Sequence, residues 1–312
     1  MSIAFLFPGQ GAQFVGMCKD IAAEFPAAAR VFRKGDEIVG FDLSSICFDG
    51  PAEELNTTAT SQPAIFLTSA AILEVVRTSG VGEELVADVT GGLSLGEYTA
   101  LYAGGLIDFE QGLLLVKRRG ELMQAASEAS RGAMVSVIGV DEGNVRELCR
   151  EAGAGELLEP SNFNCPGQIV ISGSESACDR AVRLASKYGA IKAVKLSVAG
   201  AFHTEMMSSA AQALAGALSE CKIGEPGDVK VIANVNAEYY RSSDDVVKWL
   251  TEQLTSPVLW QRCMERLIAD GVEKFYEIGP GRVLTGLMRR INRKIRVVNI
   301  SSADGLKNVI GS

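Results

Sequence analysis

The chain has 312 residues, of which 47% are hydrophobic and 22% are charged. These proportions are typical of a globular protein with one large or two modest domains, and they exclude a disordered chain or a small disulfide-rich peptide. The formal net charge of −8 argues against a broad basic surface, so we expect no nucleic-acid partner.

Short apolar segments bounded by glycine or proline alternate with longer segments whose apolar residues recur every three or four positions. The short segments predict buried strands at residues 3–7, 85–90, 133–138, 168–172, 193–196, 229–233 and 274–278. The longer segments predict amphipathic helices at residues 62–78, 109–126, 142–151, 174–188, 205–221 and 243–254. Because this alternation is typical of a parallel sheet with helical connections, the predicted fold class is α/β.

Residues 127–195 follow an order of their own: strand, helix, a loop over residues 162–167, strand, helix and strand. This order predicts a small α+β subdomain inserted into a large domain made of residues 1–126 and 196–312. The cleft between the two parts is the expected functional site.

Two absences in the sequence limit where the protein works. The apolar stretches fall short of the roughly 20 residues that span a bilayer, and the N-terminus has no basic segment before its first apolar run, so we expect no membrane contact. The seven cysteines are scattered without a C-x-x-C pair, and the chain has one histidine. We therefore expect no disulfide framework, metal site or cofactor, and a reducing cytoplasm as the location.

The segment Gly92-Leu93-Ser94-Leu95-Gly96 lies between a predicted strand and a helical run. Small residues around the serine allow a sharp turn from strand to helix that exposes the hydroxyl at the helix N-terminus. The pattern predicts that Ser94 is a nucleophile. A glycine-rich turn with an incidental serine is the alternative.

The sole histidine, His203, is the side chain best suited to take a proton from Ser94, because its ordinary pKa is about 6.5. It precedes a predicted helix, whose N-terminus favours the neutral ring. A lone histidine is more often structural, but the serine motif favours the catalytic interpretation.

The first predicted strand ends in Phe7-Pro8-Gly9-Gln10-Gly11, which offers backbone N–H groups and the Gln10 amide for an oxyanion hole. The alternative, a dinucleotide-binding loop, would need glycine in place of Phe14.

Two groups of cations have candidate roles. Arg119 lies in Lys117-Arg118-Arg119-Gly120 on a predicted helix that also presents several apolar residues, where its guanidinium could hold a substrate carboxylate; a solvated charge is the alternative. The segment from Arg282 to Arg296, called the basic segment below, has six cations and no acidic residue. It suits an acidic or phosphorylated partner, although an ordinary solvated helix face is equally compatible.

Taken in order along nearly the whole chain, these motifs closely resemble malonyl-CoA:acyl carrier protein transacylases, and also the acyltransferase domains of polyketide synthases. The segments that carry the resemblance are Gly9-Gln10-Gly11-Ala12-Gln13, Gly92-Leu93-Ser94-Leu95-Gly96-Glu97-Tyr98, Arg119-Gly120, Asn162-Phe163-Asn164, Ala201-Phe202-His203 and Glu277-Ile278-Gly279-Pro280-Gly281.

The resemblance implies a hydrolase-like large domain, a ferredoxin-like insert and ping-pong transfer of malonyl from malonyl-CoA through Ser94 to the phosphopantetheine thiol of acyl carrier protein, supplying fatty acid synthesis. His203 would act as base and acid, oriented by the backbone carbonyl of Gln253. Gln10 and the N–H of Leu95 would form the oxyanion hole.

The resemblance also implies which residues bind the acyl group. Arg119 would pair with the malonyl carboxylate, and Phe202, Met123 and Asn162 would line the substrate site. Leu95 and Phe202 are the choices of malonyl-specific relatives. The carrier would dock on the basic segment. One departure is Leu93, where relatives usually have histidine; the nucleophile pattern is retained.

Two other functions remain open from the sequence. An ordinary esterase would need a carboxylate between Ser94 and His203 in the chain to orient the base. A non-enzymatic carrier-binding module would keep the basic segment but would not acylate Ser94.

Overall fold

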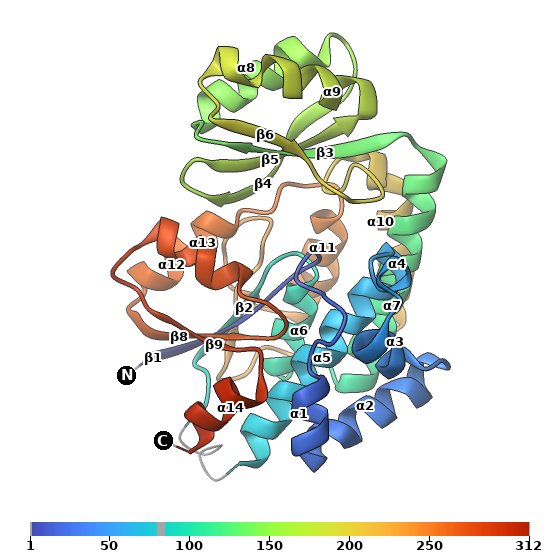
Figure 1. The fold of residues 1–312 in the computed structure, drawn as a ribbon, viewed down its shortest axis with the longest axis vertical. Coiled ribbons are helices and arrows are strands. Elements are labelled where there is room, and N and C mark those ends of the chain that lie inside the picture. Colours follow the sequence, from blue (N-terminus) through green and yellow to red (C-terminus); the bar gives the residue numbers. More distant parts are fainter. Residues whose placement is uncertain (1, 80–84, 312) are drawn as a thin grey trace.

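The computed structural model describes residues 2–79 and 85–311. Within these residues the strands form two sheets, one parallel and one antiparallel, which lie in separate parts of the molecule (Figure 1). This arrangement confirms the predicted α/β class, with a parallel sheet and a smaller antiparallel subdomain.

The parallel sheet has β1 at its centre. Across the described residues its order is β7-β2-β1-β8-β9, with all four neighbouring pairs parallel: β1 (Ser2–Phe7), β2 (Val89–Gly92), β7 (Lys230–Val231), β8 (Val272–Ile278) and β9 (Val297–Ile300). Because parallel strands end at one edge, the turns after β1 and β2 are neighbours there. Gln10 and Ser94 belong to those turns.

Side chains of β1 alternate between two hydrophobic cores, as the period of two in a strand requires. Phe5 and Phe7 pack into the larger core, while Ala4 and Leu6 pack into the other. The larger core also contains residues of α2 (Pro26–Val39), α5 (Thr58–Thr78), α7 (Phe109–Ala129), α10 (Ser208–Glu220), α11 (Ser243–Gln253) and α14 (Ala303–Ile310). The second core is completed by α12 (Trp260–Ala269) and α13 (Val283–Ile291). Helices therefore cover both faces of the sheet.

The remaining helices of the large part connect these layers. They are α1 (Lys19–Glu24), α3 (Leu43–Asp49), α4 (Ala52–Leu55), α6 (Gly96–Ala103) and η2 (Glu205–Met207). Helices α1 to α4 were missed, because no helix was predicted before residue 62. Helices α1, α3 and α4 have at most seven residues each, which is too short for a clear periodic pattern. Helix α2, which is longer, was missed as well.

Helix α5 is the one described helix that is long and apolar enough to cross a membrane by length and composition alone. Of its most apolar stretch, 83% is buried inside the fold. A buried helix that is apolar on all sides is typical of a protein core.

The small subdomain comprises the elements from β3 to β6. They are β3 (Gly132–Ile138), α8 (Glu142–Gly153), β4 (Leu158–Cys165), β5 (Gln168–Ser174), α9 (Glu175–Leu184), η1 (Ala185–Tyr188) and β6 (Lys192–Lys195). Its described strands form an antiparallel sheet of order β4-β5-β3-β6. This succession of strands and helices is the ferredoxin-like pattern.

The two faces of this sheet have different roles. Val135, Val137 and Ile171 belong to the subdomain's own core with α8 and α9, while Met134 and Val170 pack into the larger core of the parallel-sheet part. The sheet therefore lies with one face against its own helices and the other toward the large part.

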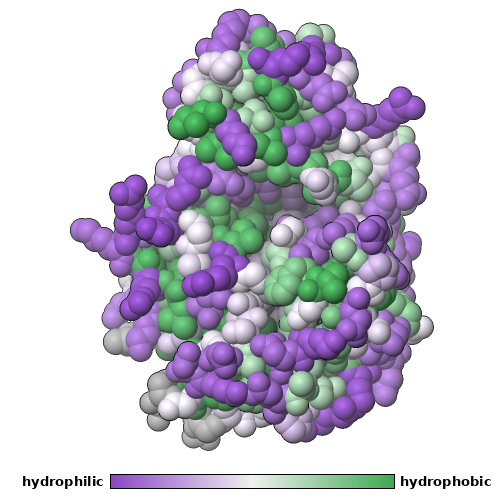
Figure 2. Space-filling model, viewed as in Figure 1, coloured by the Kyte–Doolittle hydropathy of each residue, from purple (hydrophilic) through white to green (hydrophobic). Residues whose placement is uncertain are grey.

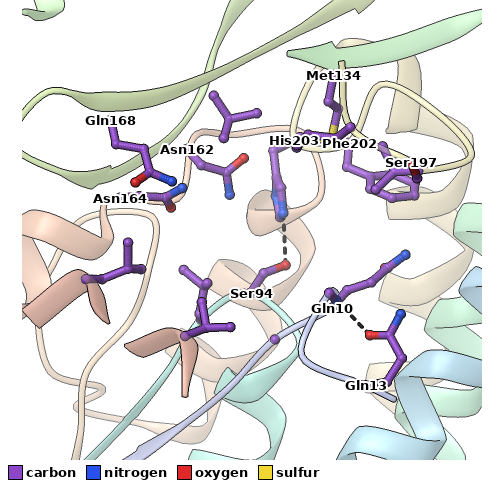
Figure 3. Close-up of a pocket in the computed structure, with 18 of the residues that line it drawn as sticks. Gln10, Gln13, Ser94, Met134, Asn162, Asn164, Gln168, Ser197, Phe202 and His203 are labelled. Carbon is purple, nitrogen blue, oxygen red and sulfur yellow. Dashed lines mark hydrogen bonds between the residues drawn. The ribbon is translucent and has the colours of Figure 1, made fainter. Parts of the chain in front are cut away.

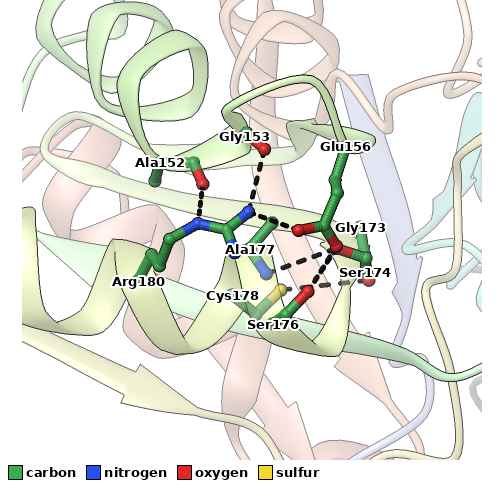
Figure 4. Close-up of polar contacts among 9 residues, drawn as sticks. All are labelled: Ala152, Gly153, Glu156, Gly173, Ser174, Ser176, Ala177, Cys178 and Arg180. Atoms are coloured by element: carbon green, nitrogen blue, oxygen red, sulfur yellow. Dashed lines mark hydrogen bonds and ion pairs between the residues drawn. The ribbon is translucent and has the colours of Figure 1, made fainter.

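Arg180 joins the two helices of the small subdomain (Figure 4). From α9, its guanidinium donates to the carbonyls of Ala152 and Gly153 at the end of α8, at 2.6 and 2.8 Å, and to Glu156 at 2.7 Å. A cation at a helix C-terminus satisfies carbonyls that have no partner within the helix. Hydroxyls of Ser174 and Ser176, followed by Arg180, lower the pKa of Glu156 to about 2.

The predicted loop at residues 162–167 is wrong for its first four positions, which belong to strand β4. Pro166-Gly167 forms the turn to β5, and Gly167 has a φ of 69°, which glycine adopts readily. Strand β4 was missed because Asn162 and Asn164 are polar residues that face a cleft. Strand β9 was also missed, and β2 begins four residues later than predicted.

Candidate active site

A cleft of about 520 Å³ lies between the small subdomain and the edge of the parallel sheet. Figure 2 shows the molecule hollowed at this junction. Asn162, Asn164 and Gln168 line it from the small subdomain and Gln10 from the turn after β1, with Ser94 and His203 between them (Figure 3). The predicted site residues that line it are Gln10, Ser94, Met123, Asn162, Phe202 and His203.

The turn that carries Ser94 depends on two glycines. Ser94 has a φ of 51°, in the left-handed region that non-glycine residues seldom adopt. A Cβ on Gly92 would lie 1.9 Å from the backbone of Gly96, and a Cβ on Gly96 would lie 2.2 Å from the carbonyl oxygen of Phe7. The chain can therefore pass from β2 into α6 this sharply only with glycine at both positions.

Ser94, His203 and the backbone of Gln253 form a continuous hydrogen-bonded chain. Ser94 Oγ is 2.9 Å from His203 Nε2, and His203 Nδ1 is 2.7 Å from the carbonyl oxygen of Gln253. Because a carbonyl only accepts, it fixes the proton on Nδ1 and leaves Nε2 free to accept the serine proton. The partner of Nδ1 is therefore a backbone carbonyl, whereas the esterase alternative required a carboxylate.

His203 is held as a neutral ring. Burial, followed by the positive charge of Arg119, lowers its pKa to about 4, although the hydrogen bond to Gln253 opposes the shift. The sequence predicted the same direction from a helix N-terminus, but the following helical turn, η2, has only three residues. The neutral form needed for a base therefore predominates at neutral pH.

The two residues expected to form the oxyanion hole come from neighbouring turns. Gln10 belongs to the turn after β1, and Leu95 directly follows Ser94. Leu95 directly precedes α6, so its N–H has no acceptor within that helix. Gln10 lines the cleft, and its amide nitrogen is 3.4 Å from Thr58 Oγ1. Both positions are compatible with the oxyanion hole that the sequence suggested.

Arg119 is not a solvated charge, since it is 1% exposed. Its Nη2 donates to Ser94 Oγ at 3.0 Å and to Gln253 Oε1 at 2.9 Å, and Nη1 donates to Gln62 Oε1 at 2.7 Å. Within the described part of the chain no carboxylate lies within 4.0 Å of it, and its Nε has no partner. A buried guanidinium without a direct ion pair is costly, and a substrate carboxylate would supply one.

The other predicted substrate contacts lie around the nucleophile. Met123 and Phe202 are buried and line the cleft, and Asn162 lines it from β4. Leu93, the departure from the relatives' pattern, also lines it while packing against the second core. Position 93 therefore adds an apolar wall to this cleft.

Sequence reasoning missed four polar residues behind the site. Glu97, Asn234 and Gln62 are buried, and Tyr240 is 4% exposed. Asn234 Oδ1 accepts from the backbone N–H of Ser94 at 2.6 Å, and so holds the elbow directly. The sequence offered two signals for Glu97: it belongs to the serine motif quoted above, and it stands in a largely apolar helix one turn after the serine.

The basic segment forms α13 and the loop after it. Arg289, Arg290 and Arg293 border, with Pro166 of the small subdomain, a second hollow of about 640 Å³. Arg290 donates to Gln168 Oε1 at 2.9 Å and to the carbonyls of Pro166 and Gly167 at 3.2 Å. Arg290 therefore binds the β4–β5 turn, although all three arginines are exposed.

Known proteins share this architecture. The model of the acyl transferase domain family matches residues 4–306, so the fold and site define an acyltransferase. The chain is 43% identical over 309 residues to the malonyl CoA-acyl carrier protein transacylase of Bacillus subtilis strain 168, covering 99% of this chain and 96% of that one. It belongs to the malonyl CoA-acyl carrier protein transacylase family.

Solved structures agree with this assignment. An acyl carrier protein S-malonyltransferase from Vibrio cholerae superimposes with a TM-score of 0.92 at 40% identity, covering 99% of this chain and 100% of that one. A malonyl-transacylase in complex with its type II PKS acyl-carrier protein gives a TM-score of 0.94 at 37% identity, covering 100% of this chain and 99% of the other.

Proposed function

We propose that the protein transfers malonyl from malonyl-CoA to the phosphopantetheine thiol of an acyl carrier protein through a malonyl ester on Ser94, in the service of fatty acid synthesis. The observation that carries the proposal is the place of Arg119. A buried guanidinium without a direct ion pair among the described residues lies 3.0 Å from the hydroxyl of a serine that is itself paired with a histidine.

The first half-reaction follows from the hydrogen-bonded chain. His203 Nε2 takes the proton from Ser94 Oγ as the oxygen attacks the thioester carbonyl. Gln10 and the N–H of Leu95 stabilise the negative oxygen of the tetrahedral intermediate. The C–S bond then breaks, and His203 returns its proton to the departing CoA thiol, which leaves Ser94 acylated.

The second half-reaction reverses these roles with a different thiol. His203 accepts the proton of the carrier's thiol, whose sulfur attacks the Ser94 ester. Collapse of the intermediate transfers malonyl to sulfur, and Ser94 recovers its proton from His203. One neutral imidazole serves both halves because each begins and ends with the same protonation state.

Arg119 selects the acyl group by charge. A malonyl group on Ser94 ends in a carboxylate, and two parallel N–H groups of a guanidinium match a carboxylate better than any neutral acyl terminus. The carboxylate would also give the buried guanidinium the direct ion pair that it lacks among the described residues.

The setting of the reaction follows from the cysteines and the partner. All seven cysteines are free thiols, which suits a reducing cytoplasm. The structurally similar transacylase in complex with an acyl-carrier protein supports a carrier as the acceptor.

Comparison of thiol transfer with hydrolysis tests the proposed function. Given malonyl-CoA alone, the protein should release about one equivalent of CoA as Ser94 is acylated and should then turn over slowly. When a phosphopantetheinylated carrier is added, CoA release should continue rapidly, with malonyl appearing on the carrier. Multiple-turnover CoA release that is equally fast without a carrier would instead indicate an esterase. No CoA release and no acylation under either condition would favour a non-enzymatic module.

Reversing the charge of Arg293 should slow the carrier half-reaction by roughly tenfold at low salt, since exposed cations steer an acidic partner. The effect should shrink as salt rises. To check this expectation, the transfer rate is measured as a function of carrier concentration at two ionic strengths. Arg183→Glu, an equal charge change at an exposed position of α9, is the matched control. Equal effects of the two variants would remove the basic segment from carrier docking.

A further inference from the structure

A buried carboxylate lies directly behind the catalytic residues. Glu97, in the first turn of α6, is 1% exposed. Its Oε2 accepts hydrogen bonds from Gln253 Nε2 at 2.6 Å and from the backbone N–H of Asn234 at 3.2 Å, and its Oε1 accepts one from the Tyr240 hydroxyl. The carboxylate thus joins three separate segments of the chain.

Two of these partners hold the reacting groups. The backbone carbonyl of Gln253 accepts from His203, and its side-chain amide also donates to the carbonyl of Ser94 at 3.1 Å. Asn234 accepts from the N–H of Ser94 and donates to the carbonyl of Gly92 at 2.8 Å. A shift of either residue would therefore move the base or the nucleophile.

The same carboxylate is connected to the substrate-binding cation. The Gln253 side-chain amide donates to Glu97 through Nε2 and accepts from Arg119 through Oε1 at 2.9 Å. One amide thus separates the buried anion from the buried cation. When His203 takes a proton, its positive charge develops near Arg119, and a negative Glu97 offsets the repulsion.

We propose that Glu97 is a positioning residue for acyl transfer, holding the His203 base and the Ser94 elbow through Gln253 and Asn234 and balancing the charge of Arg119. The inference rests on the proposed function. It assigns a role to a buried charge that the reaction steps themselves do not use.

The surroundings of Glu97 make its charge sensitive to pH near neutrality. Burial raises its pKa to about 7, while hydrogen bonds from Tyr240 and Gln253, and the charge of Arg119, oppose the rise. The other titratable groups that face it are Tyr98, Tyr240 and Cys263, and burial raises the pKa of each. These three stay neutral at pH 7, so within this buried cluster of described residues Glu97 and the lower-titrating His203 are the groups whose charge changes below pH 8.

Glu97→Gln is the informative substitution. The glutamine oxygen can accept from Gln253 and Asn234 while its NH₂ donates to the Tyr240 oxygen, so the geometry is kept and only the charge is lost. In the wild type we expect kcat for malonyl transfer to fall about tenfold as the pH falls from 8 to 6. In Glu97→Gln, kcat at pH 8 should already equal the low value that the wild type reaches at pH 6, and it should not fall further between these pH values. KM should change little.

Two further variants make the result specific. Tyr240→Phe removes a donor to the carboxylate, which should raise the pKa of Glu97 and move the fall in kcat to higher pH. Glu277→Gln alters the other buried glutamate, which caps α13 by accepting from the N–H groups of Leu284 and Thr285. It should leave the pH profile unchanged.

The outcomes separate the inference from the proposed function. A wild type that fails to transfer malonyl at any pH contradicts the proposed function. A wild type that transfers malonyl, with a pH profile that neither Glu97→Gln nor Tyr240→Phe alters, overturns the role of Glu97. If Glu97→Gln does not fold, the shift expected in Tyr240→Phe decides.

Discussion

Malonyl transfer is expected to fall by about 10²- to 10⁴-fold when His203 is replaced by alanine, the range that a general base contributes. His203 Nε2 lies 2.9 Å from Ser94 Oγ and is the only imidazole in the chain. Among the described residues, the other partner of Ser94 Oγ is the guanidinium of Arg119, which donates and cannot take the serine proton. Single-turnover acylation of Ser94 by malonyl-CoA measures the loss directly.

Backbone strain calls for a second variant at this position. His203 has a φ of 61°, which asparagine tolerates better than alanine does. His203→Asn should therefore fold with nearly native thermal stability and show a similar loss of acylation. Near-native acylation in a folded His203 variant would mean that another group accepts the proton.

Arg119→Ala is expected to lower malonyl transfer by roughly 10- to 150-fold while sparing acetyl transfer. Charge-assisted hydrogen bonds contribute about 1.5–3 kcal/mol, which corresponds to that range of rates. An acetyl group has no carboxylate, so the lost guanidinium removes no contact to it. The ratio of kcat/KM for malonyl-CoA and acetyl-CoA is the quantity to compare between variants.

Two controls accompany this comparison. Arg118→Ala, the neighbouring and exposed position that pairs with Glu121 at 3.5 Å, should change neither rate. Arg119→Lys keeps the charge but loses the two parallel donors, so it should recover only part of the discrimination. Equal losses for malonyl and acetyl in Arg119→Ala would show that Arg119 only supports the fold.

The sequence predicted those parts of the fold whose local pattern agrees with their environment. Strand β1 and helix α7 begin at or next to the expected residues, because apolar side chains mark their buried faces. Strand β4 was predicted as a loop, because Asn162 and Asn164 face a polar cleft rather than a core. Burial pattern alone cannot distinguish such a strand from a turn.

The site residues divide in the same way into those that the local sequence could predict and those that it could not. Ser94, His203 and Arg119 could be singled out because their residue types are unusual in their local setting. The contacts of Glu97 could not, because its partners Asn234 and Gln253 lie 137 and 156 residues away in the chain. Only the fold brings together α6, the end of α11 and the turn after β7 that carries Asn234.

Intact-mass measurement after mixing with malonyl-CoA tests the central claim most directly. The wild-type protein should gain the mass of one malonyl group, peptide mapping should place it on Ser94, and addition of a phosphopantetheinylated carrier should remove it. Ser94→Ala should gain no mass under the same conditions. A malonyl adduct that forms equally on Ser94→Ala, or a wild-type protein that passes malonyl to the carrier without ever being acylated, would contradict the serine-linked mechanism.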